Sequence, residues 1–258
     1  MAKIITIANQ KGGVGKTTTA AALADGLKQK GFKVLLIDLD GQGNLSYTAR
    51  ANTNGITSYE VLHGLAAAKQ AIQHTETGDI IAASPNLAGS DRELTGAGAD
   101  KRLKEALKPI SSEYDFIIID APPSLSILTV NALTAADSLI ITAQADIYSL
   151  QGIGQLYATI KAIQQTTNKG LNIAGILLTR YTARSILTRD LTEIAEQTAA
   201  QLKTRIFKAK IREAIAVKEA QASGQSVLTY SPKSNAAKDY TEFIREFLGV
   251  IDFDRRKT

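Results

Sequence analysis

The stretch Lys11-Gly12-Gly13-Val14-Gly15-Lys16-Thr17-Thr18 lies between an apolar run that predicts a strand and an Ala/Leu-rich run that predicts a helix. Glycines in such a loop let backbone N–H groups surround phosphate oxygens, and the N-terminus of the following helix adds a positive dipole. We therefore predict that these eight residues bind ATP. Lys16 should reach the β- and γ-phosphates, the Thr17 hydroxyl should ligate Mg²⁺, and Thr18 should hydrogen-bond the α-phosphate.

The pattern around this loop repeats along the chain. Apolar runs predict strands at residues 3–8, 33–38, 79–84, 115–120, 138–143 and 173–179, with a shorter strand at 205–208. Helical patterns lie between them, at residues 17–30, 101–108, 126–136, 150–166, 187–202 and 235–248. Gly31 should stop the first of these helices. This alternation predicts an α/β fold with a doubly wound, mostly parallel sheet and helices on both faces.

Carboxylates follow two of the predicted strands. Asp38-Leu39-Asp40-Gly41-Gln42-Gly43-Asn44 ends the second strand, and Asp120-Ala121-Pro122-Pro123-Ser124 ends the strand at residues 115–120. Ligands of doubly wound sheets bind at the carboxyl ends of the strands, and Mg²⁺ prefers hard oxygen ligands. We expect Asp38 and Asp120 to join Thr17 in supporting the metal, Asp38 acting on the Mg²⁺ shell or on its own loop.

The glycine-rich loop departs from the usual pattern in one respect. Gln10 stands where a Gly is usual and Lys11 follows it, which gives the deviant Walker A pattern KGGxGK[ST]. With this loop, the stretch at 38–44 and the DAPPS ending at 120–124, the chain resembles the ParA/MinD family of P-loop ATPases. The resemblance implies that Lys11 reaches across a homodimer interface to the partner's ATP, much as an arginine finger does. It also implies that Asp40 positions the attacking water, so Lys11, Lys16 and Asp40 are the expected catalytic residues.

The resemblance extends from Lys3 to about Leu248 and is strongest to small ParA, or Soj-like, proteins that partition plasmid or chromosome DNA. Two departures stand out: Gly41 replaces the usual Pro of the Asp40 loop, and residues 208–212 replace an Arg-rich turn. The resemblance implies a ParB-like partner that binds a centromere site and stimulates hydrolysis. We expect one ATPase domain over residues 1–258, without an N-terminal helix-turn-helix domain.

Two other functions are weighed against partitioning. A MinD-like positioning ATPase would carry a basic amphipathic helix at its end, and the ending DFDRRKT has too few apolar residues for one. A metabolic P-loop ligase of the dethiobiotin-synthetase type would lack the second loop lysine and a basic C-terminal half. No apolar run reaches the ~20 residues of a membrane span, and no secretory signal is present, so we expect a cytoplasmic protein.

The composition and the uneven charge of the chain favour a polyanionic partner. The chain has no Cys and two His, which excludes disulfides and thiolate sites and argues against a His-rich metal site. Its net charge is +5, but residues 161–218 hold eleven basic and four acidic residues, a balance of +7 that leaves −2 elsewhere. We expect the ATP-bound dimer to bind double-stranded DNA without sequence preference, and hence to associate with the nucleoid. The candidate phosphate contacts are Arg184, Arg189, Lys208, Lys210 and Arg212.

Overall fold

A seven-stranded sheet forms the centre of the computed structural model, which describes residues 1–182 and 186–251, except for the side chains of residues 150 and 186–190. Its strand order is β3-β4-β2-β5-β1-β6-β7. The strands are β1 (Lys3–Ala8), β2 (Val34–Asp38), β3 (Ile72–Thr75), β4 (Gly78–Ile81), β5 (Phe116–Asp120), β6 (Ser138–Ala143) and β7 (Asn172–Leu178). All neighbouring pairs are parallel except β3 and β4, which form an antiparallel hairpin at one edge.

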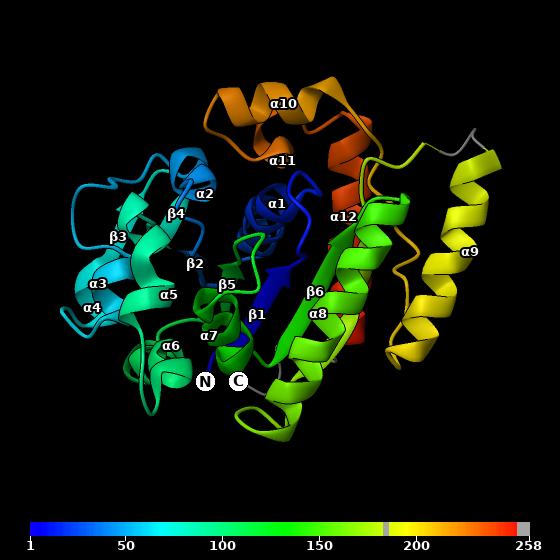
Figure 1. Cartoon of the computed structure of the whole chain (residues 1–258). Coiled ribbons are helices and arrows are strands. Elements are labelled where there is room, and N and C mark those ends of the chain that lie inside the picture. Colours follow the sequence, from blue (N-terminus) through cyan, green and yellow to red (C-terminus); the bar gives the residue numbers. More distant parts are fainter. Residues whose placement is uncertain (183–185, 252–258) are drawn as a thin grey trace.

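Helices cover both faces of this sheet, as Figure 1 shows. The α-helices are α1 (Lys16–Gln29), α2 (Asn44–Thr48), α3 (Ser58–Leu62), α4 (Ala68–Ala71), α5 (Ser90–Glu93), α6 (Arg102–Leu107), α7 (Ile127–Ala135), α8 (Ile147–Gln165), α9 (Ile186–Gln201), α10 (Ile215–Ala222), α11 (Val227–Tyr230) and α12 (Asn235–Val250). Short 3₁₀ helices are η1 (Pro85–Gly89), η2 (Ala99–Lys101) and η3 (Lys108–Ile110). The predicted doubly wound, mostly parallel α/β fold is confirmed.

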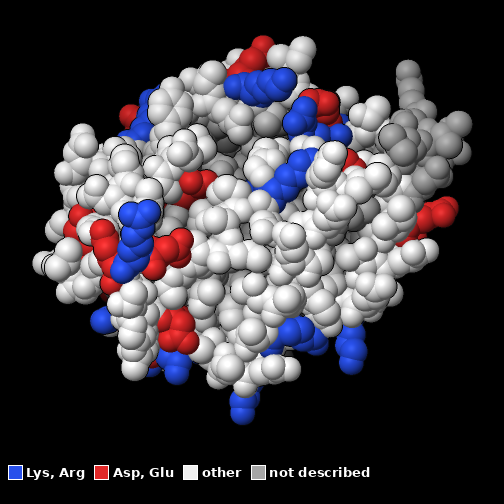
Figure 2. Space-filling view, in the orientation of Figure 1, with Lys and Arg blue, Asp and Glu red and all other residues white. Residues whose placement is uncertain are grey.

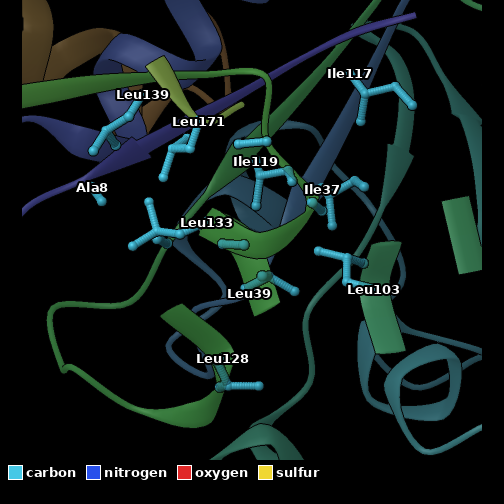
Figure 3. Packing of buried hydrophobic residues seen from close by; sticks show 14 of the residues in the cluster. Ala8, Ile37, Leu39, Leu103, Ile117, Ile119, Leu128, Leu133, Leu139 and Leu171 are labelled. Atoms are coloured by element: carbon cyan, nitrogen blue, oxygen red, sulfur yellow. The ribbon is translucent and has the colours of Figure 1, made fainter. Parts of the chain in front are cut away.

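Two hydrophobic clusters lie on opposite sides of the sheet because successive strand residues point to opposite faces. One joins Leu35 and Ile37 of β2 and Ile117 and Ile119 of β5 to α3, α6, α7 and α8; Figure 3 shows Ile37, Ile117 and Ile119 beside Leu103 and Leu133. The other cluster joins the alternate strand residues to α1 and α12. Every residue of β5 is buried, which is the reason for its continuous apolar run.

The first helix ends as the sequence predicts. Gly31 has a φ of 82°, and its N–H bonds to the carbonyl of Lys28 while the Phe32 N–H bonds to that of Leu27. This pair of bonds is a Schellman motif, in which a glycine adopts the left-handed conformation at low cost. The turn leads the chain back along the sheet into β2.

The predicted strand at residues 205–208 is wrong. Ile206 forms only an isolated bridge with Ile176 of β7. Beyond it, the N–H groups of Lys208 and Ala209 bond to the carboxylate of Glu246 on α12, at 2.9 and 3.0 Å. The Glu246 side chain therefore accepts the hydrogen bonds that the backbone N–H groups of a continued strand would have donated to β7.

Candidate nucleotide site

A cavity of about 690 Å³ opens at the carboxyl ends of the parallel strands. Gly12, Gly13 and residues 15–18 form one side of it, the Asp40 loop and α2 form a second, and residues 211–222 form a third. Figure 1 places α10 above α1 at this end of the sheet, and in Figure 2 the surface is hollowed below the charged groups at the top of the view. The position matches the strand-end rule for doubly wound sheets.

The glycine-rich loop connects β1 to α1 as predicted. Gly13 and Gly15 have φ values of 74° and 78°, which non-glycine residues rarely adopt, and Gly15 is the N-cap residue of α1. The Lys16 side chain is buried on the cavity wall, and its Nζ donates to the Lys11 carbonyl at 3.0 Å. Burial lowers the pKa of Lys16, while the nearby Asp120 and Asp40 counteract that effect.

Asp120 lies at the end of β5, directly beside the first turn of α1. The Thr17 hydroxyl donates to its Oδ2 at 2.6 Å, while its buried Oδ1 has no hydrogen-bond partner within the described residues. Burial, and then the charge of Asp38, raises the pKa of Asp120 well above its usual range. An orphaned buried carboxylate oxygen next to a hydroxyl is a fit for Mg²⁺ and its water shell.

The metal would still need further ligands. In the part of the chain that the structure describes, no three His, Cys, Asp or Glu side chains cluster so that they could hold a metal ion. This suits Mg²⁺, which proteins usually hold through one or two side chains, waters and the phosphates of the substrate. The residues present therefore fit a Mg²⁺–nucleotide complex.

Asp38 pairs with Asp120 in the register of β2 and β5 and is fully buried. Its carboxylate accepts hydrogen bonds from the N–H and hydroxyl of Ser46, at 2.8 and 2.7 Å, and from the Asp40 N–H at 3.0 Å. Burial raises the pKa of Asp38 to about 6. These bonds tie the start of α2 to the sheet, and a role for Asp38 in the Mg²⁺ shell stays a prediction.

Asp40 lies on the cavity wall in the turn that precedes α2. Its Oδ1 accepts the Gln42 N–H at 3.0 Å, and its carbonyl accepts the Gly43 N–H at 2.8 Å. The side chain is thus held in a tight turn that faces the phosphate loop, where its charge acts on Lys16. A carboxylate placed near a phosphate-binding lysine in this way is suited to position an attacking water.

Lys11 does not share the cavity wall with Lys16. Its Nζ forms an ion pair with Asp146 Oδ2 at 2.7 Å, and each side chain is 30% exposed. Although burial opposes it, the hydrogen bond from Lys11 lowers the pKa of Asp146, which also caps α8 through the Ser149 N–H at 2.9 Å. The ring of Tyr148 lies 5.9 Å from the Lys11 ammonium.

The third side of the cavity was missed from the sequence. Arg180, at the carboxyl end of β7, pairs with Glu213 at 2.8 Å and has a φ of 48°. On α10, Gln221 donates to the Thr18 hydroxyl at 2.9 Å. The strand-end rule could have indicated Arg180, but no local pattern marked the short helix α10 as a wall of this site.

The predicted DNA contacts have mixed surroundings. Arg184 and the side chain of Arg189 lie outside the described residues. Lys208 is exposed, and the Lys210 ammonium lies 4.5 Å from the ring centre of Tyr181. Arg212 lines the nucleotide cavity and donates through Nε to Asp239 at 2.9 Å, with a second bond from Nη2. These contacts leave the DNA assignments as predictions.

Within residues 1–182 and 186–251, no helix combines the length and apolar character that crossing a membrane requires.

Comparison with known proteins gives consistent results over most of the chain. A family model described as an AAA domain matches residues 2–173, two thirds of the sequence. The sporulation initiation inhibitor protein Soj of Bacillus subtilis is 38% identical over 251 residues, covering 95% of this chain and 98% of Soj. The chromosome partitioning protein ParA of Myxococcus xanthus is 37% identical over 251 residues, covering 95% of this chain and 88% of that protein.

A solved structure with a bound nucleotide is also similar. The cobyrinic acid a,c-diamide synthase of Mycobacterium smegmatis, solved with bound ADP and magnesium, is 34% identical with a TM-score of 0.82. The similarity covers 95% of this chain and 93% of that one. The activity in its name is that protein's own. Its bound ADP and magnesium are the kinds of ligand that the cavity described above would fit.

Proposed function

The chain belongs to the family of Soj- and ParA-type ATPases, and from that premise we propose that it partitions plasmid or chromosome DNA as an ATP-dependent dimer. Residues 1–258 would act as one ATPase domain, since a single sheet joins the described elements. Residues 11–18 would bind ATP, with Lys16 on the β- and γ-phosphates and Thr18 on the α-phosphate after release from Gln221. Asp40 would position the attacking water.

Thr17 and Asp120 would hold Mg²⁺, and Asp38 would support its shell through the fixed Asp40 loop. The bound metal would neutralise charge on the phosphate oxygens. The orphaned Oδ1 of Asp120 beside the Thr17 hydroxyl supports this assignment. Lys16, buried next to the same carboxylate, provides the second positive charge of the site.

The position of Lys11 is the observation that supports an ATP-dependent dimer. It belongs to the phosphate loop, yet its ammonium pairs with Asp146 outside the wall of its own chain's cavity. In a two-fold pair of chains that face each other across their ATP sites, this ammonium could leave Asp146 for the partner's phosphates. A partly exposed ion pair contributes little to stability, so exchange of Asp146 for a multiply charged phosphate is favourable.

Replacing Lys11 with Ala should abolish ATP-dependent dimerisation while leaving nucleotide binding to the monomer largely intact. The reason is that the substitution removes charge from the interface and leaves Lys16 in place. Light scattering with ATP and with ADP measures the effect. Asp146→Asn is the matched control, since it keeps Lys11 and the α8 cap and should dimerise at least as well as the original chain. Dimers of normal stability in Lys11→Ala would refute the trans role.

Non-specific DNA binding by the dimer is the second part of the proposal. It is supported by the +7 balance of residues 161–218 and by the exposure of Lys208. One chain offers few phosphate contacts, and dimerisation doubles their number, so ATP would switch DNA binding by joining two basic surfaces. With phosphate contacts alone, sequence preference should be slight and the protein should associate with the nucleoid.

Reversing Lys208 and Lys210 together to Glu should weaken duplex binding at least about tenfold at physiological salt, equally for all sequences. The log–log salt slope should fall by roughly 0.9 for each lost phosphate contact. We choose these lysines because Arg212 is already engaged by Asp239. Binding is measured by anisotropy across a salt series with ATP and with ADP. Lys101→Glu, a single charge reversal at an exposed residue of η2, should leave affinity unchanged. Equal binding in both nucleotides would rule out the switch.

A ParB-like protein bound to a centromere site would stimulate hydrolysis and release the dimer from DNA. The partitioning names of the relatives support this partner. A MinD-like role would show itself as ATP-dependent flotation with lipid vesicles, which the proposal expects to be absent.

A further inference from the structure

Three polar side chains from neighbouring strand ends hold the backbone of the phosphate loop. Asn9, after β1, accepts the Lys11 N–H at 3.0 Å and donates to the Thr142 carbonyl at 2.6 Å. Gln144, after β6, donates to the Gly13 carbonyl at 3.0 Å. Thr179, after β7, donates from its hydroxyl to the Val14 carbonyl at 2.9 Å. Side chains from outside the loop therefore hold its backbone at three of its residues.

The two carbonyl contacts determine where the next N–H groups point. In a trans peptide the C=O and the N–H point in opposite directions within one plane. Gln144 holds the Gly13 carbonyl, so the N–H of the same peptide, that of Val14, points away from Gln144. Thr179 holds the Val14 carbonyl, so the Gly15 N–H points away from Thr179. Both N–H groups are thus turned away from their braces, in the orientation that a phosphate-binding loop needs.

Thr179 is the brace with the most constrained surroundings. It is 2% exposed, and its own N–H bonds to the Ala143 carbonyl of β6 at 2.8 Å, so the sheet fixes its backbone. Its methyl carbon lies 3.5 Å from the place where a Cβ on Gly15 would be. The hydroxyl therefore bonds to Val14, and the methyl occupies the space beside Gly15, the next residue, whose φ is positive.

We propose that Thr179 is a positioning residue for ATP hydrolysis, which orients the Val14–Gly15 peptide so that its N–H faces the phosphates. The inference rests on the proposed role of residues 11–18 as the phosphate site. Thr179 would touch no reacting atom and would act only through the loop. Gln144 does the same for the Gly13–Val14 peptide.

The test compares Thr179→Val, which keeps the shape and removes the hydroxyl, with Thr179→Ser, which keeps the hydroxyl. Steady-state kinetics of the full chain should show kcat/KM for ATP reduced about tenfold or more in Thr179→Val, mainly through a higher KM, and restored to within about threefold in Thr179→Ser. Thr142→Val is the matched control: it removes a buried threonine hydroxyl on neighbouring β6 that has no partner within the described residues, and should leave kcat/KM unchanged.

Two outcomes would overturn the inference: wild-type kinetics in Thr179→Val, or a defect that Thr179→Ser does not restore, which would indicate packing alone. Should Thr179→Val fail to fold, Gln144→Met, at a partly exposed position, carries the same test on the adjacent peptide, with the same expected rise in KM. Lys16→Ala distinguishes a failure of the proposed function from a failure of the inference about Thr179. If it too hydrolyses ATP normally, the loop is not the phosphate site and the proposed function fails; if it is inactive while both brace variants are normal, only this inference fails.

Discussion

Lys16→Ala should remove tight ATP binding and, with it, hydrolysis. The Lys16 ammonium is buried on the cavity wall next to Asp120 and is held at the Lys11 carbonyl, so it is placed to meet a phosphate without rearrangement. Truncating one partner of a buried, hydrogen-bonded charge pair costs about 2–5 kcal/mol. At about 1.4 kcal/mol for each factor of ten, this cost corresponds to a loss of ATP affinity between about 30-fold and several thousandfold.

Isothermal titration with a non-hydrolysable ATP analogue and Mg²⁺ measures this loss directly. Lys11→Ala is the control, because it deletes the other lysine of the same loop and should bind the analogue with nearly normal affinity as a monomer. An affinity of Lys16→Ala within about threefold of the original chain would show that the phosphates lie elsewhere.

Asp40→Ala should give a protein that binds ATP and dimerises yet hydrolyses it at least about 100-fold more slowly, the usual scale for losing one positioned proton acceptor. The Asp40 turn is anchored by bonds that do not need its side chain: its N–H to Asp38 and its carbonyl to the Gly43 N–H. The loop should therefore keep its shape when the carboxylate is removed.

A single-turnover assay separates this chemical step from binding and product release. Gln42→Ala, in the same turn, is the control and should retain hydrolysis, because its hydrogen bond to Asp40 comes from the backbone N–H, which the substitution keeps. Hydrolysis at the normal rate in Asp40→Ala would show that another group positions the attacking water.

Local patterns were sufficient to predict the parts of the site that the chain forms in one stretch. The glycine-rich loop, Asp40 and Asp120 each follow an apolar strand, and parallel strands bring their carboxyl ends to one edge. The meeting of these residues at one end of the sheet could be predicted for this reason, whereas the expected roles of Lys11 and Asp40 came from the family resemblance. The β6 strand lies at the predicted residues 138–143, whereas β4 ends at Ile81, three residues before the predicted end.

Features that depend on contacts between distant residues could not be predicted in this way. The ion pair of Lys11 with Asp146 and the contact of Gln221 with Thr18 each join residues more than a hundred positions apart. Likewise, Glu246 takes the backbone donors of residues 208 and 209, which ended the expected strand at 205–208. The antiparallel strand β3 was not predicted either, because its four residues, three half-buried and one exposed, carry no apolar run.

The braces at Asn9, Gln144 and Thr179 have a consequence for biosynthesis. The loop they hold is complete in the sequence by residue 18, yet its last support is added only when β7 pairs with β6. A nascent chain that lacks β7 would carry the whole nucleotide motif without the scaffold that shapes it, and such non-local pairing is slow. Since a ligand that binds only the folded state stabilises it, ATP should favour late intermediates over early ones during folding. Nucleotide affinity in chains released at increasing lengths would then report when β7 joins the sheet.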